Sequence, residues 1–200
     1  IVFASSNSID VNYDDGIYHA VITGEKTKKQ IQFVSSSNLI TNNEAHNNSK
    51  SIFTINTGFF DPKNQKTVSY IVNDYQTIED PIFNSDLMLN PALRKNLRKI
   101  LDRTEFRVLD CDSKLKYEIA SHSSKVDFMC SIKTSAQGGP RLLPQLRLEE
   151  EFFILVRDGK IVSESASSLH KYPRTAIGIR ENKVYLFIFV VVVVFFRFHI

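Results

Sequence analysis

Short apolar stretches, many of them β-branched, recur along this chain between polar turns. Runs of this length bounded by Gly, Asn, Asp and Ser are typical of β-strands. Residues 17–22 and 31–34 flank a polar turn at 24–29, which predicts two paired strands. Later in the chain we expect strands at 51–55, 106–109, 115–120, 126–132, 151–156, 160–162, 183–190 and after Arg174, with tight turns at 157–160 and 180–183.

Helix signals are fewer. Asn90 and Pro91 are the residue types favoured at the N-cap and the first position of a helix, and an apolar stripe follows them as far as Leu101. The basic residues between the apolar positions are typical of a solvated helix face. The Asn- and Ser-rich segment 38–50 predicts a surface loop. Together these elements predict a single α+β domain, built on a strand-dominated mixed sheet with a few helices.

Composition and charge exclude several classes of protein. The 200 residues are 42% hydrophobic and 24% charged, which is enough to bury one core and too apolar for a disordered chain. A net charge of +3 is too small to favour a nucleic-acid partner. The apolar run at 184–196 has thirteen residues, and a helix that crosses a bilayer needs about 20. We therefore expect no nucleic-acid partner and no transmembrane span.

The two cysteines are Cys111 and Cys130, and neither has a His or Cys at the spacing of a zinc site. No metal ion or cofactor is expected. In an exported protein the pair can form a disulfide that closes a loop of about 20 residues, worth about 3 kcal/mol in the chain-entropy model. Two free buried thiols are the alternative, because spacing does not show whether the Cβ atoms meet.

Both ends of the printed sequence depart from the pattern of the interior. Residues 1–16 begin with an apolar run that ends at Ala4, as the end of a signal peptide does, and a first strand would have the same pattern. Near the other end, five consecutive valines and an abrupt stop do not suit a strand, and an uncovered tail of this kind promotes aggregation. We expect the domain to span residues 17–190 and the tail 191–200 to be aberrant, the product of a slipped reading frame or a truncated gene.

Three polar strings stand at the ends of predicted strands. The first is Asn-Thr-Gly-Phe-Phe-Asp at 56–61. Gly58 lets the backbone approach a ligand closely, Asn56 and Asp61 supply an amide and a carboxylate, and Phe59 can wall a pocket. Taken alone, the string also fits a turn with flanking core residues.

The second string is Gln-Gly-Gly-Pro at 137–140. It places Gln137 beside two flexible residues, Gly138 and Gly139. Successive backbone N–H groups in such a turn can form an anion-binding nest. As an isolated string it is weak evidence for a site.

The third string is Pro-Arg-Thr-Ala-Ile-Gly at 173–178, in which Arg174 and Thr175 enter an apolar strand. The forked donors of a guanidinium suit a phosphate or a carboxylate, although an ion pair with a neighbouring acid would also place an arginine there. His122 and His170 have side chains of the type used for proton transfer, but a lone histidine is more often structural.

Together and in this order, the three strings resemble the phosphodiester glycosidase family, whose eukaryotic member is the uncovering enzyme of the mannose 6-phosphate pathway. The resemblance covers residues 17–190, and the segment 90–111 is similar to a bacterial branch of the family. It implies an extracytoplasmic hydrolase that cleaves the bond between a sugar's anomeric carbon and a phosphodiester, releasing free sugar and a phosphomonoester. Such a reaction has an oxocarbenium-like transition state and a leaving phosphate whose charge must be held.

The resemblance also assigns residues to the site. Arg174 is expected to bind the phosphate, and Asn56 and Asp61 to contact the sugar or the attacking water, which makes these three the catalytic residues. The substrate-binding residues are expected to be Gly58, Phe59, Gln137, Gly138, Gly139 and Thr175.

Family members continue beyond the strand after Arg174 into a helical segment and an Asp-Gly-Gly-Gly-Ser-like loop, which the printed sequence lacks. We therefore expect a C-terminally truncated member of the family. Two alternatives to an active hydrolase stay open. One is a non-catalytic module that binds sugar phosphates, and the other is an inactive, unstable remnant.

Overall fold

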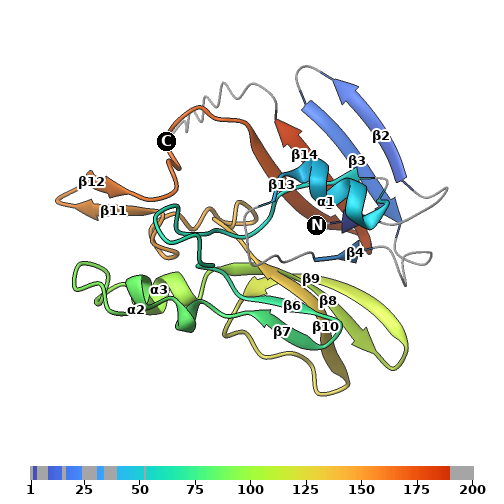
Figure 1. Ribbon diagram of the computed structural model, residues 1–200, viewed down its shortest axis with the longest axis horizontal. Helices are drawn as coiled ribbons and strands as arrows, with labels where there is room; N and C mark the ends of the chain where they lie inside the picture. The colour runs from blue at the N-terminus through green and yellow to red at the C-terminus, as the bar shows by residue number, and fades with distance from the viewer. Residues whose placement is uncertain are drawn as a thin grey trace.

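The computed structural model of the chain describes residues 2–3, 9–14, 17–23, 31–33, 40–51 and 53–189. Strands dominate these residues and the helices are short, which confirms the α+β class (Figure 1). The predicted turn at 24–29 and the tail 191–200 lie outside the described residues.

A four-stranded antiparallel sheet forms one layer. Its order is β13 (Arg174–Arg180), β14 (Lys183–Phe189), β3 (Ile17–Thr23) and β2 (Ile9–Asp14). The turn predicted at 180–183 joins β13 to β14, and both of its central residues, Glu181 and Asn182, have the positive φ that a two-residue hairpin turn requires. The first half of the apolar run at 184–196 is therefore a strand with a partner on each side.

A five-stranded antiparallel sheet forms the other layer. Its order is β7 (Gln76–Glu79), β6 (Ile71–Asn73), β10 (Cys130–Gln137), β8 (Thr104–Cys111) and β9 (Lys114–Ser121). Cys111 and Cys130 stand opposite each other where β8 and β10 meet, and they form a disulfide rather than two free thiols.

Two small sheets complete the fold. One has the order β4 (Ile31–Gln32), β1 (Val2–Phe3) and β5 (Phe53–Thr54), and the other is the hairpin of β11 (Ile154–Arg157) and β12 (Lys160–Glu164). The prediction that 17–22 pairs with 31–34 is wrong, because β3 lies between β14 and β2 while β4 pairs with β1. The strands that the structure describes pair in antiparallel fashion, so they form four antiparallel sheets where we expected one mixed sheet. Short connections between consecutive strands favour this outcome.

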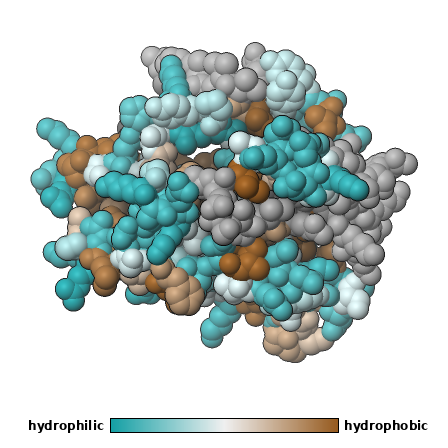
Figure 2. Space-filling view, in the orientation of Figure 1, coloured by the Kyte–Doolittle hydropathy of each residue, from teal (hydrophilic) through white to brown (hydrophobic). Residues whose placement is uncertain are grey.

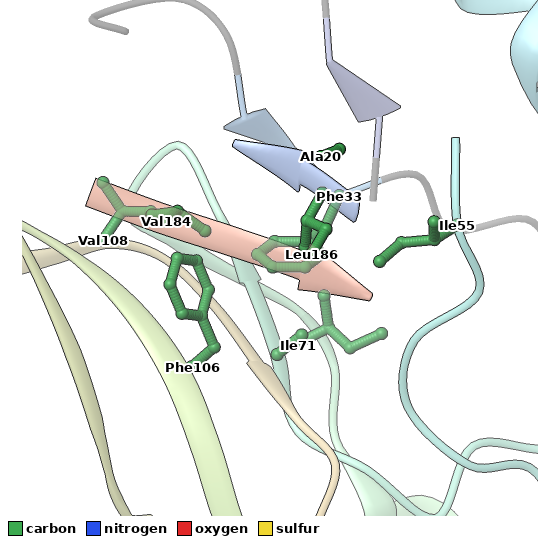
Figure 3. Packing of buried hydrophobic residues seen from close by; sticks show 9 residues of the cluster. Ala20, Phe33, Ile55, Ile71, Phe106, Val108, Val184 and Leu186 are labelled. Carbon is green, nitrogen blue, oxygen red and sulfur yellow. The ribbon is translucent and has the colours of Figure 1, made fainter. Parts of the chain in front are cut away.

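The core lies between the two larger sheets. In Figure 3, Val184 of β14 lies over Phe106 of β8. Alternation along β8 explains the contact, because Phe106 and Val108 face the core while Glu105 and Arg107 point to the opposite face of the sheet. The buried cluster contains Ala20, Phe33, Ile55, Ile71, Phe106, Val108, Ala136, Val184 and Leu186.

The segment 38–50 is not the loop that we expected. Helix α1 (Asn42–Ser49) occupies most of it, and a capping box starts the helix. The Thr41 hydroxyl accepts from the Glu44 backbone N–H, and the Glu44 carboxylate accepts from the Thr41 backbone N–H. These reciprocal bonds satisfy two donors that would otherwise be exposed at the helix start.

The helix expected from Asn90 is shorter than predicted, since α3 covers only Leu97–Leu101. Asn90 instead caps a turn with its side chain, which accepts from the Ala92 N–H. Two four-residue turns follow, in which the Leu93 N–H donates to the Asn90 carbonyl and the Asn96 N–H donates to the Leu93 carbonyl. Two short elements that the sequence did not suggest precede it, the 3₁₀ helix η2 (Pro81–Phe83) and α2 (Ser85–Met88).

Two strands start later than predicted because the residues expected at their beginnings form turns instead. The Asp127 side chain accepts from the Met129 N–H and its carbonyl accepts from the Cys130 N–H, which delays β10 to Cys130. The Phe153 N–H donates to the Leu148 carbonyl in a wider turn, and β11 begins after it at Ile154.

The surface is mainly polar, with apolar residues scattered over the face in Figure 2. Phe83, Leu89 and Phe128 are among the most exposed apolar side chains. Within the part of the chain that the structure describes, no helix has the length and apolar character needed to cross a membrane.

Candidate functional site

The first and third strings meet in the fold. Asn56 follows the buried Ile55 just after β5, and Thr175 is the second residue of β13. The Thr175 hydroxyl donates to the Asn56 side-chain oxygen over 3.4 Å, although 119 residues separate the two. Both side chains are accessible, so a polar ligand can compete for their hydrogen-bonding groups.

The first and second strings are also neighbours. Gly58 has a φ of +69°, and a Cβ built on it would lie 3.4 Å from Ser69 Cβ and 3.7 Å from the Gln137 carbonyl oxygen. The Phe59 N–H donates to Ser69 Oγ over 2.8 Å and fixes the turn against that residue. Glycine therefore suits position 58 because its backbone is left-handed, and a Cβ there would be in ordinary van der Waals contact with Ser69 and the second string.

The Gln137 side chain is fully buried and binds backbone groups rather than facing a ligand. Its side-chain nitrogen donates to the carbonyls of Leu101 and Arg103, at 2.8 and 3.2 Å, and its side-chain oxygen accepts from the Tyr70 N–H. Because buried amides that are satisfied in this way fix their surroundings, the Gln137 side chain holds the strand end that presents Gly138.

Gly138 and Gly139 differ sharply in their surroundings. The Gly138 N–H donates to the Thr104 carbonyl, and no atom lies within 4 Å of the place where its Cβ would stand. A Cβ on Gly139, whose φ is +91°, would lie 2.3 Å from Glu151 Oε2 and 3.1 Å from the Phe153 ring. A side chain could therefore be added at Gly138 without a clash, whereas Gly139 has no room for one.

The two glycines give a matched pair of alanine variants. We expect Gly139→Ala to lower the free energy of unfolding by about 2 to 3 kcal/mol, because it adds backbone strain and a clash with a buried carboxylate. Gly138→Ala should lower it by less than about 1 kcal/mol. Urea unfolding of both variants measures the difference, and equal losses would contradict the packing described for Gly139.

Glu151 is buried beside this glycine turn. One of its carboxylate oxygens accepts from the Thr104 hydroxyl over 2.6 Å and from the Arg141 N–H over 3.4 Å. The other, Oε2, has no hydrogen-bond partner among the described residues. Glu151 fills the space that the missing Cβ of Gly139 leaves free.

Arg103 is a buried cation that packs against Phe59 of the first string and against Phe153. Its guanidinium lies 4.1 Å from the centre of the Phe153 ring and 5.5 Å from that of Phe59, and it donates to the carbonyls of Glu151 and Phe152. Burial lowers the pKa of Arg103 to about 10, and the Glu151 carboxylate partly offsets this shift. The group therefore keeps its charge at neutral pH and holds Phe59 in place by a cation–π contact.

Arg174 opens β13 next to Thr175. Its guanidinium donates to the backbone carbonyls of Ala166, Ser167 and His170 and lies 5.9 Å from the centre of the Tyr172 ring. Within the described part of the chain it forms no ion pair with a carboxylate. The alternative of a surface ion pair is therefore not what the structure shows, and the positive charge stays available to an anion.

Asp61 does not join the other two expected catalytic residues. Its carboxylate accepts from the Lys63 N–H over 2.9 Å, and its backbone N–H donates to the Lys66 carbonyl. Among the described residues, no contact links the Asp61 side chain to Asn56 or Thr175. Its carboxylate caps the turn that follows the first string.

Comparison with known proteins bears directly on this grouping of strings. A family model described as phosphodiester glycosidase matches residues 49–192, which include all three. The chain belongs to the phosphodiester glycosidase family. The sequence resemblance is thereby confirmed at the level of the family. No curated protein and no solved structure matched the chain.

Sequence reasoning missed the buried charged residues of this family member. Arg103, Glu105, Arg107 and Glu151 were not among the expected site residues, yet all four are buried, and Glu151 lies directly beside Gly139. The alternation Glu-Phe-Arg-Val at 105–108 carried a usable signal, because a core strand with charges on its other face must bury or pair them.

The described part of this family member contains no group of three or more His, Cys, Asp or Glu side chains that could hold a metal ion. What the site offers a ligand is neutral hydrogen-bonding groups at Asn56 and Thr175, an open turn at Gly138 and the cation of Arg174.

Proposed function

We propose that this protein hydrolyses glycosyl phosphodiesters, cleaving the bond between the anomeric carbon and the phosphate oxygen. One observation carries the proposal. Three strings that lie far apart in the sequence converge, with Thr175 bonded to Asn56 and Gly58 packed against the carbonyl of Gln137. Convergence of this kind is expected of a ligand site and has no obvious role in the core, because Asn56 is exposed.

Arg174 is the phosphate-binding group in this proposal. Three of its N–H donors bind backbone carbonyls, which fix the guanidinium at the start of β13 without neutralising it. A guanidinium held in this way can bind a phosphate and stabilise the negative charge that grows on the phosphate as the bond breaks.

The reaction consumes one water molecule. Its oxygen forms the new bond to the anomeric carbon, the bonding electrons leave with the phosphate oxygen, and the proton released by the water ends on the phosphate or in solvent. Asn56 and Thr175 offer hydrogen bonds to the sugar or to that water.

The test is turnover of glycosyl phosphodiesters by the full chain in water enriched in oxygen-18. Cleavage at the anomeric carbon leaves the phosphomonoester at its ordinary mass, whereas attack at phosphorus makes it heavier. Release of an unlabelled phosphomonoester supports the proposal. A labelled one, or saturable binding of the diester without turnover, contradicts it, and the second result would favour a sugar-phosphate binding module.

We also propose that the protein works outside the cytoplasm. The Cys111–Cys130 disulfide supports this location, because such bonds persist in oxidising compartments and are rare where thiols are kept reduced. Fractionation of cells that express the whole gene tests it, and recovery of the protein with free thiols in the cytoplasmic fraction would contradict it.

A further inference from the structure

A buried ion pair lies on the face of the five-stranded sheet that points away from the core. Glu105 and Arg107 are two residues apart on β8, and their side chains are each 1% exposed. Arg107 Nε donates to Glu105 Oε1 over 2.6 Å. The second carboxylate oxygen of Glu105 is therefore free to hold another group.

That group is His122, which follows the end of β9. Its Nδ1 lies 2.9 Å from Glu105 Oε2. A carboxylate accepts hydrogen bonds, so Nδ1 carries the proton and neutral His122 has its basic lone pair on Nε2. Nε2 makes no hydrogen bond among the described residues, and the side chain is 37% exposed. A buried carboxylate thus orients a histidine whose other nitrogen is open to a ligand.

The ring of His122 is fixed on one face as well. Tyr70 stacks on it with ring centres 3.9 Å apart and planes within 3°. Burial, together with the carboxylates of Asp80 and Glu105, raises the pKa of Tyr70, so its hydroxyl stays protonated at neutral pH. Stacking and the Glu105 bond together leave the imidazole little freedom to rotate.

This histidine is next to the candidate site. The backbone N–H of His122 and the side-chain nitrogen of Gln137 both donate to the Arg103 carbonyl, at 3.3 and 3.2 Å. The Gln137 backbone N–H donates to the Tyr70 carbonyl, and the Tyr70 N–H donates to the Gln137 side-chain oxygen. Tyr70 also directly follows Ser69, the residue packed against Gly58. His122 is therefore linked to the second string through one residue, Arg103 or Tyr70, and to Gly58 of the first string through two, Tyr70 and Ser69.

We propose that His122, oriented by Glu105, is the proton-transfer group of this hydrolase. The inference rests on the proposed function and adds a catalytic residue to it. Neutral His122 takes at Nε2 a proton from the water whose oxygen bonds to the anomeric carbon. The electron pair of the breaking bond leaves with the phosphate, and the imidazolium then returns its proton to the phosphomonoester, whose second pKa is about 6. One water is consumed, and the histidine ends as it began.

Charged side chains of both signs surround the segment that carries His122. Glu105 contacts the ring directly, and Arg107 donates to the His122 carbonyl over 2.8 Å. On either side, Asp102 accepts from the Ser123 N–H and Arg147 donates to the Ser121 hydroxyl. Glu118 also accepts from Arg107 over 3.0 Å, so three acids and two arginines surround this segment, and Glu105 is the acid that contacts the ring.

The decisive experiment compares pH profiles of kcat for the wild type and His122→Gln. We expect kcat to fall by about 10²- to 10⁴-fold, with KM little changed, and the acid limb of the profile to disappear. The matched control is His46→Gln, since His46 is bonded through Nδ1 to the hydroxyl of Ser51 and is not part of the site. His122→Gln with normal kcat and an unchanged acid limb would overturn the proposal.

A binding measurement separates this inference from the proposed function. In the wild-type protein, NMR signals of the Gly138 amide and the His122 ring are followed while glucose 1-phosphate is added. Shifts of both signals support the inference even if turnover is slow. A shift of Gly138 alone overturns the role of His122 and leaves the hydrolase proposal standing. No shift of either, in a protein that also turns over no diester, overturns both.

Discussion

Arg174→Ala is expected to reduce hydrolysis of glycosyl phosphodiesters by about 10³-fold or more, to the limit of detection, with little loss of stability. Phosphate charge grows in the transition state, and a fixed cation that meets it there is worth more to kcat than to substrate binding. Arg174 is the cation at the junction of the first and third strings, one residue from the Thr175 to Asn56 hydrogen bond. Steady-state kinetics and the unfolding midpoint are measured on the same preparation.

Arg180→Ala is the matched control for this variant. Arg180 stands at the other end of β13, is largely exposed, and forms a surface pair with Glu181 over 3.6 Å. We expect it to keep near-normal kcat. Arg174→Lys should recover only part of the activity, because an ammonium retains the charge and loses the forked donors. An Arg174→Ala enzyme with near-normal turnover would refute the phosphate-binding role and weaken the whole assignment.

The strands and turns of this fold were predictable where the signal is local. The turn at 180–183 is an example, because its length and polar residues determine a hairpin whatever the rest of the chain does. The partners of a strand are a different matter. β3 pairs with β14, more than 150 residues away, and nothing in the short apolar segment 17–22 specifies that partner.

Helix α1 has a start signal in the sequence, but the Asn- and Ser-rich composition of the segment led us to predict a loop. Thr41 and Glu44 form a capping box, which is visible in the sequence as Thr-x-x-Glu. The eight residues that follow Thr41 have no apolar stripe, and only Ala45 is buried, so the segment reads as a polar loop. A helix start signal without an amphipathic face is weak evidence for a helix, but in this segment the helix does form.

The candidate site was predictable as three strings but not as an arrangement. Gly58, Gly138, Arg174 and Thr175 lie where a site can use them, whereas Gln137 is turned inward. Whether a polar side chain faces a ligand or a backbone carbonyl depends on neighbours that come from elsewhere in the chain. The same holds for His122, which looks like a lone histidine until Glu105 is placed beside it.

Arg107→Met is expected to lower the free energy of unfolding by about 3 to 5 kcal/mol, the loss seen when one partner of a buried ion pair is removed. Arg107 uses all five of its N–H donors. They bind Glu105, Glu118 and three backbone carbonyls in the segment 121–124. Methionine fills similar volume but leaves the Glu105 carboxylate buried without its cation. Chemical denaturation followed by circular dichroism measures the change.

Two comparisons make the Arg107 result interpretable. Arg147→Met removes an arginine that makes one side-chain bond to the same segment, at Ser121, and should cost less than about 1 kcal/mol. The double variant Glu105→Leu, Arg107→Met removes both charges and should cost less than the sum of the single variants, because no unpaired charge stays buried. Additive losses would mean that the two side chains do not interact as a pair. Because Arg107 also holds the His122 carbonyl, the single variant should lose activity at temperatures where it remains folded, which links the stability of this network to the proton transfer proposed for His122.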